Sequence, residues 1–197
     1  KGKPKNVRGI VFAEQEAGCL AGVAAATVSQ SGTISSVGGL KIPPVDAFIA
    51  GYQFCAKKLK PAIITLNAYS QDFVAQDKCK EVALNQIGEG SDVVFQVAGQ
   101  CGLGAITAAA DSSVWGIGVD RDQKSLGRHI MTSAVKRVDT SVFLTAKAVK
   151  DGKFKGGTDA TFNLRNNGVS VGRIDARVPK RFITRMNALK PLIMSGK

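Results

Sequence analysis

The sequence predicts an α/β protein whose parallel sheet is covered by helices on both faces. Apolar runs of strand length alternate at least four times with stretches whose apolar residues recur at helical spacing. The apolar runs are nearly continuous rather than alternating, which is typical of parallel strands buried on both faces. Single glycines between the segments supply short turns, and crossovers of this kind are right-handed.

Three strand–helix units are expected in the first half of the chain. The strands are predicted at residues 7–13, 33–40 and 62–67. The helices that follow them are predicted at residues 14–29, between Pro43-Pro44 and Pro61, and at residues 75–87. The second helix is expected to bury one face, on which recur Phe48, Tyr52, Cys55 and Leu59.

In the second half of the chain, strands and helices alternate regularly up to Asp122 and less regularly beyond it. Strands are predicted at residues 92–99 and 114–120, with an alanine-rich helix at 103–110 between them. Beyond Asp122 we expect a strand at 130–135 and then a helix that Asp139 caps and that ends before Gly152. The residues of that helix expected to face the core are Val142, Ala146 and Val149.

A hairpin and a helix are expected to close the chain. The turn signal Asn166-Asn167-Gly168 separates residues 160–164 from 169–172, which is typical of a β-hairpin. A helix is predicted at residues 181–194. Its expected inward face consists of Phe182, Met186, Leu189 and Ile193.

The chain of 197 residues carries a net charge of +12 at pH 7. Two classes of protein compete to explain this charge: a nucleic-acid-binding protein and a receptor that works near an anionic surface. The basic residues form separate clusters at residues 57–60, 147–155 and 180–185, with few aromatic residues near them and no nucleic-acid-binding motif. We therefore expect no nucleic-acid partner.

No membrane-spanning segment is expected, because the sequence has no apolar run of about 18 residues. The N-terminal residues Lys1, Lys3 and Lys5 lack the apolar core of a signal peptide. A signal or lipid anchor that belongs to this protein is therefore expected upstream of Lys1.

The four cysteines, Cys19, Cys55, Cys79 and Cys101, show no C-x-x-C pair and no zinc spacing. Cys55 and Cys79 fall on the apolar faces of predicted helices. We expect small buried thiols, and a disulfide is left open as the alternative.

Ligand-binding residues are sought where strands end, because ligands of open α/β sheets bind beyond the carboxyl ends of the strands. Asp120 ends an apolar strand and is suited to two adjacent sugar hydroxyls; a helix cap or surface carboxylate is the alternative. Phe73, in a polar loop, is suited to stack on a planar ligand, or else packs as a lid on its own lobe. The turn from Gly99 to Gly104 presents helix N–H groups, or is only a tight turn; it matches neither a dinucleotide fingerprint nor a P-loop.

Catalytic and metal sites are not predicted. His129 is the single histidine and lies in an irregular stretch, so it is expected at the surface or at a cap. Asp120 and Asp122 suit ligand binding better than acid–base work, and no cofactor is implied. Solute binding is the expected function. Two alternatives are an enzyme on a doubly wound sheet that acts on a nucleotide-like substrate, and the effector lobe of a transcription regulator.

Several short motifs resemble, in order, those of the basic membrane protein family of ABC-transporter solute receptors. They are EQEAG (14–18), LAG (20–22), VGG (37–39), FIAG (48–51), GLG (102–104), GVDRDQ (118–123), TSAVKRVD (132–139) and DGKFKGG (151–157). Together they span nearly the whole chain, so the sequence is identified as a member on their joint evidence.

The resemblance implies a type I periplasmic-binding-protein fold, in which two α/β lobes close on a ligand around a hinge. The implied units are residues 1–13 as a remnant of the first lobe, 14–124 as the second lobe, 125–158 as the hinge and a first-lobe segment, and 159–197 as a C-terminal hairpin and helix. Family members carry further strand–helix units at the N-terminus. The chain is thus expected to hold one nearly complete lobe and part of the other, and to bind solute poorly by itself.

The resemblance also implies the site. By position, Phe73 matches an aromatic residue that stacks on a base, and Gly99 matches a glycine whose backbone contacts the ligand. Asp120 matches a carboxylate that holds ribose hydroxyls, and Lys136 matches a lysine that reaches the sugar. The implied solute is a purine nucleoside and the implied partner an ABC-transporter permease. The implied state is a monomeric lipoprotein at the periplasm or cell surface.

The chain departs from the family pattern near this site. Gly99-Gln100-Cys101-Gly102 stands where Gly-Gly-Thr-Gly is usual, which places larger side chains at the edge of the pocket. Asp46 stands where a basic residue is common, and the loop at residues 68–71 also differs.

Overall fold

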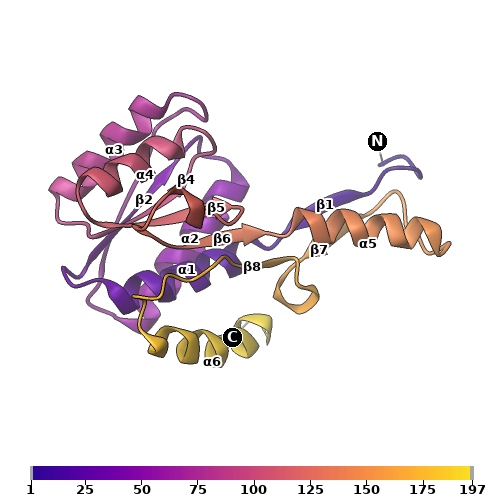
Figure 1. The fold of residues 1–197 in the computed structure, drawn as a ribbon. Coiled ribbons are helices and arrows are strands. Elements are labelled where there is room, and N and C mark those ends of the chain that lie inside the picture. Colours follow the sequence, from indigo (N-terminus) through magenta and orange to yellow (C-terminus); the bar gives the residue numbers. More distant parts are fainter. Residues whose placement is uncertain (1, 196–197) are drawn as a thin grey trace.

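The computed structural model describes residues 2–195 and shows a layered α/β body from which a smaller arm projects (Figure 1). The strands are β1 (Gly9–Phe12), β2 (Thr33–Gly38), β3 (Ile64–Tyr69), β4 (Val93–Val97), β5 (Trp115–Asp120), β6 (Ile130–Lys136), β7 (Asp159–Phe162) and β8 (Val169–Val171). The α-helices are α1 (Glu14–Val28), α2 (Pro43–Leu59), α3 (Gln76–Gly88), α4 (Gly102–Asp111), α5 (Val138–Lys150) and α6 (Lys180–Ser195). The predicted α/β class is confirmed.

The body is built on a six-stranded sheet of order β3-β2-β4-β5-β6-β8. Its first five strands are parallel, and β8 runs antiparallel to β6. β2 leads to β3 on one side, whereas β3 crosses back to β4 on the other side of β2, so the strand order reverses between β2 and β4. Such a reversal opens a crevice at the carboxyl ends of the two strands.

Helices cover both faces of this sheet, as Figure 1 shows: α3 and α4 lie on one face, and α1 and α2 lie on the other with α6 outside them. The larger core lies under α1 and α2 and contains Phe48, Tyr52 and Phe95. In α6, Phe182 and Met186 are buried against the same core. The inward faces predicted for α2 and α6 are therefore confirmed.

Glycines bring α1 and α2 into close contact. A Cβ atom added to Gly18 would lie 2.1 Å from the Phe48 carbonyl oxygen, and one added to Gly22 would lie 2.0 Å from the Tyr52 carbonyl oxygen. On the facing helix, a Cβ at Gly51 would lie 2.1 Å from the Gln15 carbonyl oxygen. The helix backbones can approach this closely only because these positions carry no side chain. This approach sets where Phe48 and its neighbours stand.

Two disulfides overturn the expectation of buried thiols. Cys19 of α1 is bonded to Cys55 of α2, and Cys79 of α3 is bonded to Cys101, the residue before α4. The Cα atoms of the pairs are 5.0 and 5.5 Å apart, within the range of disulfides. A small apolar position suits a thiol and a half-cystine equally, and only the fold shows which cysteines are neighbours.

The arm corrects the prediction of a C-terminal hairpin. β7 pairs in parallel with β1, from Gly9 opposite Asp159 to Phe12 opposite Phe162, whereas β8 joins the main sheet beside β6. The Asn166-Asn167-Gly168 segment therefore connects two sheets. The residues do form a turn, with Asn167 in the left-handed region, but a turn signal does not specify which strands pair.

Helix α5 also differs from its prediction. Val142 and Val149 are exposed instead of facing a core, and Ser141 is the one buried residue of this helix. Spacing reveals that a helix has an apolar face but not what covers it. Asp139 lies in the first turn rather than at the cap, which is Arg137. The Arg137 guanidinium, 2.7 Å away, lowers the pKa of Asp139 to about 2.

Within residues 2–195, no helix combines the length and the apolar composition needed to cross a membrane.

Candidate ligand-binding site

A cavity of about 300 Å³ lies at the carboxyl ends of β2, β4, β5 and β6, where the strand order reverses. All four residues predicted as ligand contacts line it: Phe73, Gly99, Asp120 and Lys136. The remaining wall is apolar and comes mainly from α2 and from strand ends, namely Ile42, Pro44, Val45, Phe48, Val97 and Val119. The structure thus brings together residues that the sequence separates widely.

Phe73 lies in the loop between β3 and α3, and its ring covers the end of β2. A Cβ atom at Gly39 would lie 2.4 Å from this ring, so the ring rests directly on the Gly39 backbone. Asp72 shapes the loop by accepting hydrogen bonds from the N–H groups of Val74 and Ala75 at 2.8 and 3.1 Å. The Lys78 ammonium and then these N–H groups hold the pKa of Asp72 well below its usual range, so the carboxylate stays charged at neutral pH.

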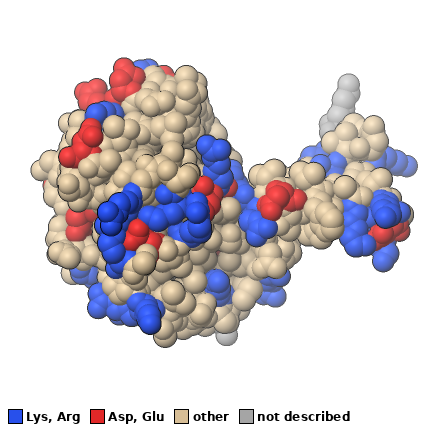
Figure 2. Space-filling model, in the orientation of Figure 1, with Lys and Arg blue, Asp and Glu red and all other residues tan. Residues whose placement is uncertain are grey.

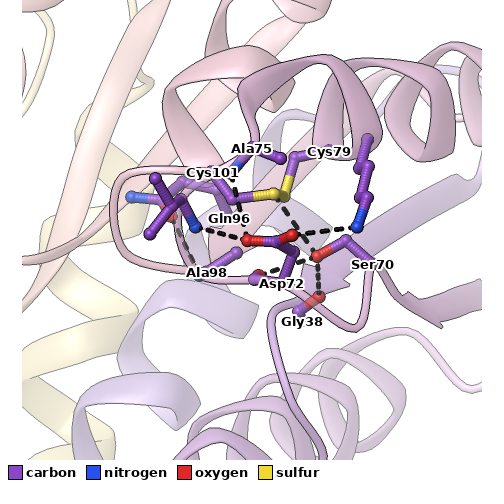
Figure 3. Close-up of a disulfide and its surroundings, with 10 residues drawn as sticks. Gly38, Ser70, Asp72, Ala75, Cys79, Gln96, Ala98 and Cys101 are labelled. Atoms are coloured by element: carbon purple, nitrogen blue, oxygen red, sulfur yellow. Dashed lines mark hydrogen bonds and ion pairs between the residues drawn. A yellow bond between two sulfur atoms is a disulfide. The ribbon is translucent and has the colours of Figure 1, made fainter.

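Gly99 lines the cavity next to Phe73. Its φ of 57° lies in the left-handed region, and a Cβ there would lie 3.4 Å from the Phe73 carbonyl oxygen. Two residues later, the Cys101 N–H donates to that same carbonyl at 3.0 Å. The β4–α4 turn and the Phe73 loop are therefore held against each other, and Figure 3 shows the Cys79–Cys101 disulfide that joins the same turn to α3.

Asp120 ends β5 in a conformation that side chains seldom adopt. Its φ is 64°, and the Arg121 N–H reaches back to the Val119 carbonyl at 2.7 Å. The left-handed region costs about 1 kcal/mol for a residue with a side chain, and aspartate tolerates it better than most. The turn directs the carboxylate into the cavity, where its side chain is 53% exposed and open to a ligand.

Lys136, the last residue of β6, supplies the positive charge of the site. Its Nζ atom lies 3.0 Å from Asp120 Oδ1 and 3.9 Å from Glu14 Oε1. The same ammonium lies 5.5 Å from the centre of the Phe48 ring, a cation–π distance. Two carboxylates and an aromatic face therefore fix the position of this lysine.

Glu14 supports the site through Lys136 without lining the cavity, and the strand-end rule does not select it. Its side chain is 12% exposed, and burial raises the pKa of its carboxyl even though the Lys136 ammonium opposes that change. A usable signal was present: an acidic residue stands at the first position of an otherwise apolar helix, directly after a strand. Glu14 contributes to the site by positioning Lys136.

A buried pair of glutamines supports the loop that carries Asp120, and it was also missed. Gln123 Oε1 accepts from Gln96 Nε2 at 2.8 Å and from the Val119 N–H at 3.0 Å. Gln96 is fully buried in β4, and its Oε1 accepts from the Ala98 N–H at 3.2 Å. A glutamine in the middle of an apolar strand was the available signal, since a buried amide needs partners.

A second cavity of about 850 Å³ adjoins the first and shares Gly99, Val119, Asp120 and Lys136 with it. Its outer part is lined by charged side chains that pair with each other, such as Arg173 with Asp122 at 2.5 Å. Figure 2 shows the same mixture on the face drawn, where basic side chains gather with acidic ones among them. The net positive charge is thus partly balanced beside the site.

The residues around the cavity are suited to bind a ligand that has a flat apolar part and hydroxyl groups. An aromatic ring offers a flat apolar contact, and the Asp120–Lys136 pair offers an acceptor and a donor for hydroxyl groups. His129 precedes β6, at the opposite end of that strand from Lys136, and lines neither cavity, so it takes no part in the site. Among residues 2–195, no cluster of three or more His, Cys, Asp or Glu side chains is placed to hold a metal ion.

Comparisons of the sequence place it among transport proteins. The sequence model of the Bmp family, described as "ABC transporter substrate-binding protein PnrA-like", matches residues 1–195. The ABC transporter nucleoside-binding protein BmpA of Lactococcus lactis subsp. cremoris is 38% identical over an alignment of 187 positions, which covers 85% of this chain and 53% of that protein. Basic membrane protein A of Borreliella afzelii is 32% identical over 98% of this chain and 60% of its own length. The chain thus spans little more than half the length of these relatives.

Comparisons of the structure place the fold. A solute-binding protein of an ABC transporter system from Aeropyrum pernix matches with a TM-score of 0.86 at 22% identity, over 100% of this chain and 66% of that one. A transcriptional activator of the comK gene from Bacillus halodurans matches with a TM-score of 0.90 at 23% identity, over 99% of this chain and 68% of that one. These matches show the α/β fold of periplasmic binding proteins. Because both solute receptors and transcription regulators have it, the fold alone does not define a function.

Proposed function

Because this chain belongs to the Bmp family of PnrA-like ABC transporter substrate-binding proteins, we propose that it binds a purine nucleoside and delivers it to a membrane permease. Members of this family bind solutes for transport and are not enzymes, so turnover is not part of the proposal. The nucleoside-binding relative at 38% identity supports the choice of solute.

The observation that carries the proposal is the meeting of Phe73, Gly99, Asp120 and Lys136 around one cavity. A purine is flat, and stacking on the Phe73 ring suits any purine base. Ribose presents two adjacent hydroxyls, and an ionised carboxylate such as Asp120 accepts from both. The Lys136 ammonium, 3.0 Å from that carboxylate, is placed to donate to a sugar oxygen.

We propose that the body around residues 14–124 is the ligand-binding lobe and that residues 125–158 form the hinge and part of the first lobe. β6 supports this division, because it begins inside the main sheet and its end at Lys136 leads into α5 of the arm. Within residues 2–195, three segments connect the body to the arm: those after β1, after β6 and after β7.

The two disulfides support an extracytoplasmic location for the protein, because disulfides persist in oxidising compartments. We propose a periplasmic or cell-surface receptor that is monomeric and held at the membrane by a lipid anchor. A permease is its proposed partner.

Calorimetric titration tests the proposed solute. Adenosine, guanosine and inosine are titrated into the full-length gene product and into this chain, with the free purine bases and ribose as controls. For the full-length product we expect one nucleoside per molecule, weaker binding of the free base, and no measurable binding of ribose alone, whereas this chain by itself should bind nucleosides poorly. Absence of nucleoside binding by the full-length product, or conversion of nucleosides to base and sugar at catalytic rates, would contradict the proposal.

A further inference from the structure

Two irregular segments shape the apolar side of the site: the loop that carries Phe73 and the turn that begins at Gly99. We propose that the Cys79–Cys101 disulfide is the positioning device that holds these two segments in their binding arrangement. The inference rests on the proposed function, because it takes Phe73 and Gly99 as ligand contacts.

The contacts around the disulfide point to this role (Figure 3). In the described part of the chain, three ties join the Phe73 loop and its helix to the β4–α4 turn, and each ends on Cys101. They are the bond to Cys79, the hydrogen bond from the Cys101 N–H to the Phe73 carbonyl at 3.0 Å, and the contact of Cys101 Sγ with Ser70 Oγ at 3.3 Å. Cys101 follows Gly99 by two residues, so these ties also place that glycine.

The other side of the loop is anchored differently. The N–H groups of Ser70 and Gln71 donate to the carbonyls of Gly38 and Gly39 at 2.8 and 3.1 Å, which fixes the loop to the end of β2. Asp72 ties the loop only to the start of its own helix, through Val74, Ala75 and Lys78. Without the disulfide, the loop would keep its hydrogen bonds to the end of β2, whereas α3 would lose its covalent link to the turn after β4.

Burial indicates a permanent link rather than a redox switch. Both half-cystines are fully buried, in a small apolar cluster that also contains Ala83 and Ala105. Thiol–disulfide exchange requires access of the attacking thiolate to a sulfur atom. The folded protein therefore protects this bond, and its effect is to restrict the loop at all times.

Such a restriction raises affinity by pre-organisation. A site that is competent for only a fraction of the time binds with its affinity reduced by that fraction. If the unlinked loop holds Phe73 in place about a tenth of the time, the nucleoside binds about tenfold more weakly.

The other disulfide of the chain, Cys19–Cys55, supplies a matched control. Cys19–Cys55 closes a separation of 36 residues and Cys79–Cys101 one of 22, so chain entropy predicts at least as large a loss of stability from removing the former. Cys19 and Cys55 join α1 to α2 and do not line the cavity. Comparing C79A/C101A with C19A/C55A thus separates positioning from stability. C79V with C101A keeps more of the buried volume and serves if C79A/C101A does not fold.

Amide hydrogen exchange without ligand and adenosine titration, both on the full-length product, together test the inference. On removal of Cys79–Cys101 we expect residues 70–75 and 99–103 to exchange at least about tenfold faster and adenosine to bind about tenfold more weakly, whereas removal of Cys19–Cys55 leaves both within about twofold. Unchanged exchange in these segments, or equal effects of the two removals, would overturn the positioning role. If the unmodified protein does not bind adenosine but the exchange contrast is seen, the proposed function fails and the positioning role stands.

Discussion

Single residues set the chemistry of the site, and Asp120 combines a charge with an uncommon backbone conformation. Its φ of 64° places the carboxylate beside Lys136 at the edge of the cavity. Such conformations persist when the surrounding structure determines them, here through the Gln96–Gln123 pair and the pairing of Asp120 with Val135 of β6.

Asp120→Ala is expected to weaken nucleoside binding by about 10–100-fold, because charge-assisted hydrogen bonds to ribose are worth about 1.5–3 kcal/mol each. Binding of the free base should hardly change, since it has no ribose to lose. Asp120→Asn is the matched variant: asparagine tolerates the left-handed conformation, so it removes the charge with less backbone strain. Calorimetric titration with the nucleoside and with the free base measures the loss of affinity for each. Equal losses for nucleoside and base would assign Asp120 to the structure of the lobe instead.

Phe73→Ala should show a different pattern and weaken both the nucleoside and the free base. Base–aromatic stacking is worth about 1–3 kcal/mol, so the loss should be roughly tenfold or more for each ligand. The same titrations measure it, with Phe73→Tyr as the variant that keeps the ring. A loss confined to the nucleoside would show that the ring does not contact the base.

The strand-end rule could find Phe73, Gly99 and Asp120 because position along the chain already places each of them at the end of a strand. The rule could not identify Glu14, Gln96 or Gln123. Glu14 acts on a lysine in a strand far along the sequence, and Gln96 meets Gln123 only after β4 and β5 pair. Partners of this kind are properties of the fold.

At the scale of elements, the backbones of α1 and α2 meet with no side chain between them at the glycine positions, so this contact should tolerate added atoms poorly. Gly22→Ala places a methyl group against the Tyr52 carbonyl and is expected to lower the free energy of unfolding by about 1–3 kcal/mol. Gly88→Ala, also in a helix, meets nothing within 4 Å and should instead raise it by about 0.4–1 kcal/mol. Urea unfolding of both variants provides the measurement. A stable Gly22→Ala protein would mean that the helices can move apart at little cost.

Elements were predicted well where a segment's own pattern decides its structure. The strands of the main sheet and α1 to α4 follow from apolar runs, helical spacing and glycine or proline ends. β7 and β8 were predicted as strands, but their pairing was wrong because the partners, β1 and β6, lie far away in the sequence. The prediction that α5 buries its apolar face was wrong for the same reason, since periodicity carries no information about neighbouring elements.

For the molecule as a whole, an ionic cluster fastens the C-terminal segment to the body. Asp175 accepts from Lys124 at 2.6 Å and from Arg177 at 2.8 Å, while its own N–H donates to the Met131 carbonyl. The Arg177 guanidinium, together with the Lys124 ammonium, holds the pKa of Asp175 well below its usual value, although partial burial opposes this. The cluster is thus charged at neutral pH.

Asp175→Asn is expected to lower the free energy of unfolding at pH 7 by about 2 kcal/mol, because hydrogen bonds to a charged group are lost. A carboxyl with a lowered folded pKa stabilises the protein above its unfolded pKa of 3.8, and this contribution disappears as the pH falls below that value. The difference between the two proteins should therefore shrink between pH 4 and about pH 2, as followed by urea unfolding. A difference in the free energy of unfolding that stays constant over this range would show that packing, not charge, holds the C-terminal segment to the body.

The disulfides join cysteines that follow one another along the chain, the first to the second and the third to the fourth. A chain that emerges from its N-terminus presents Cys55 as the next thiol after Cys19, and Cys101 as the next after Cys79. Among these four cysteines, linking each newly exposed thiol to the one before it that is still free produces both bonds, with no later reshuffling between them. Oxidation of this protein can therefore keep pace with its synthesis.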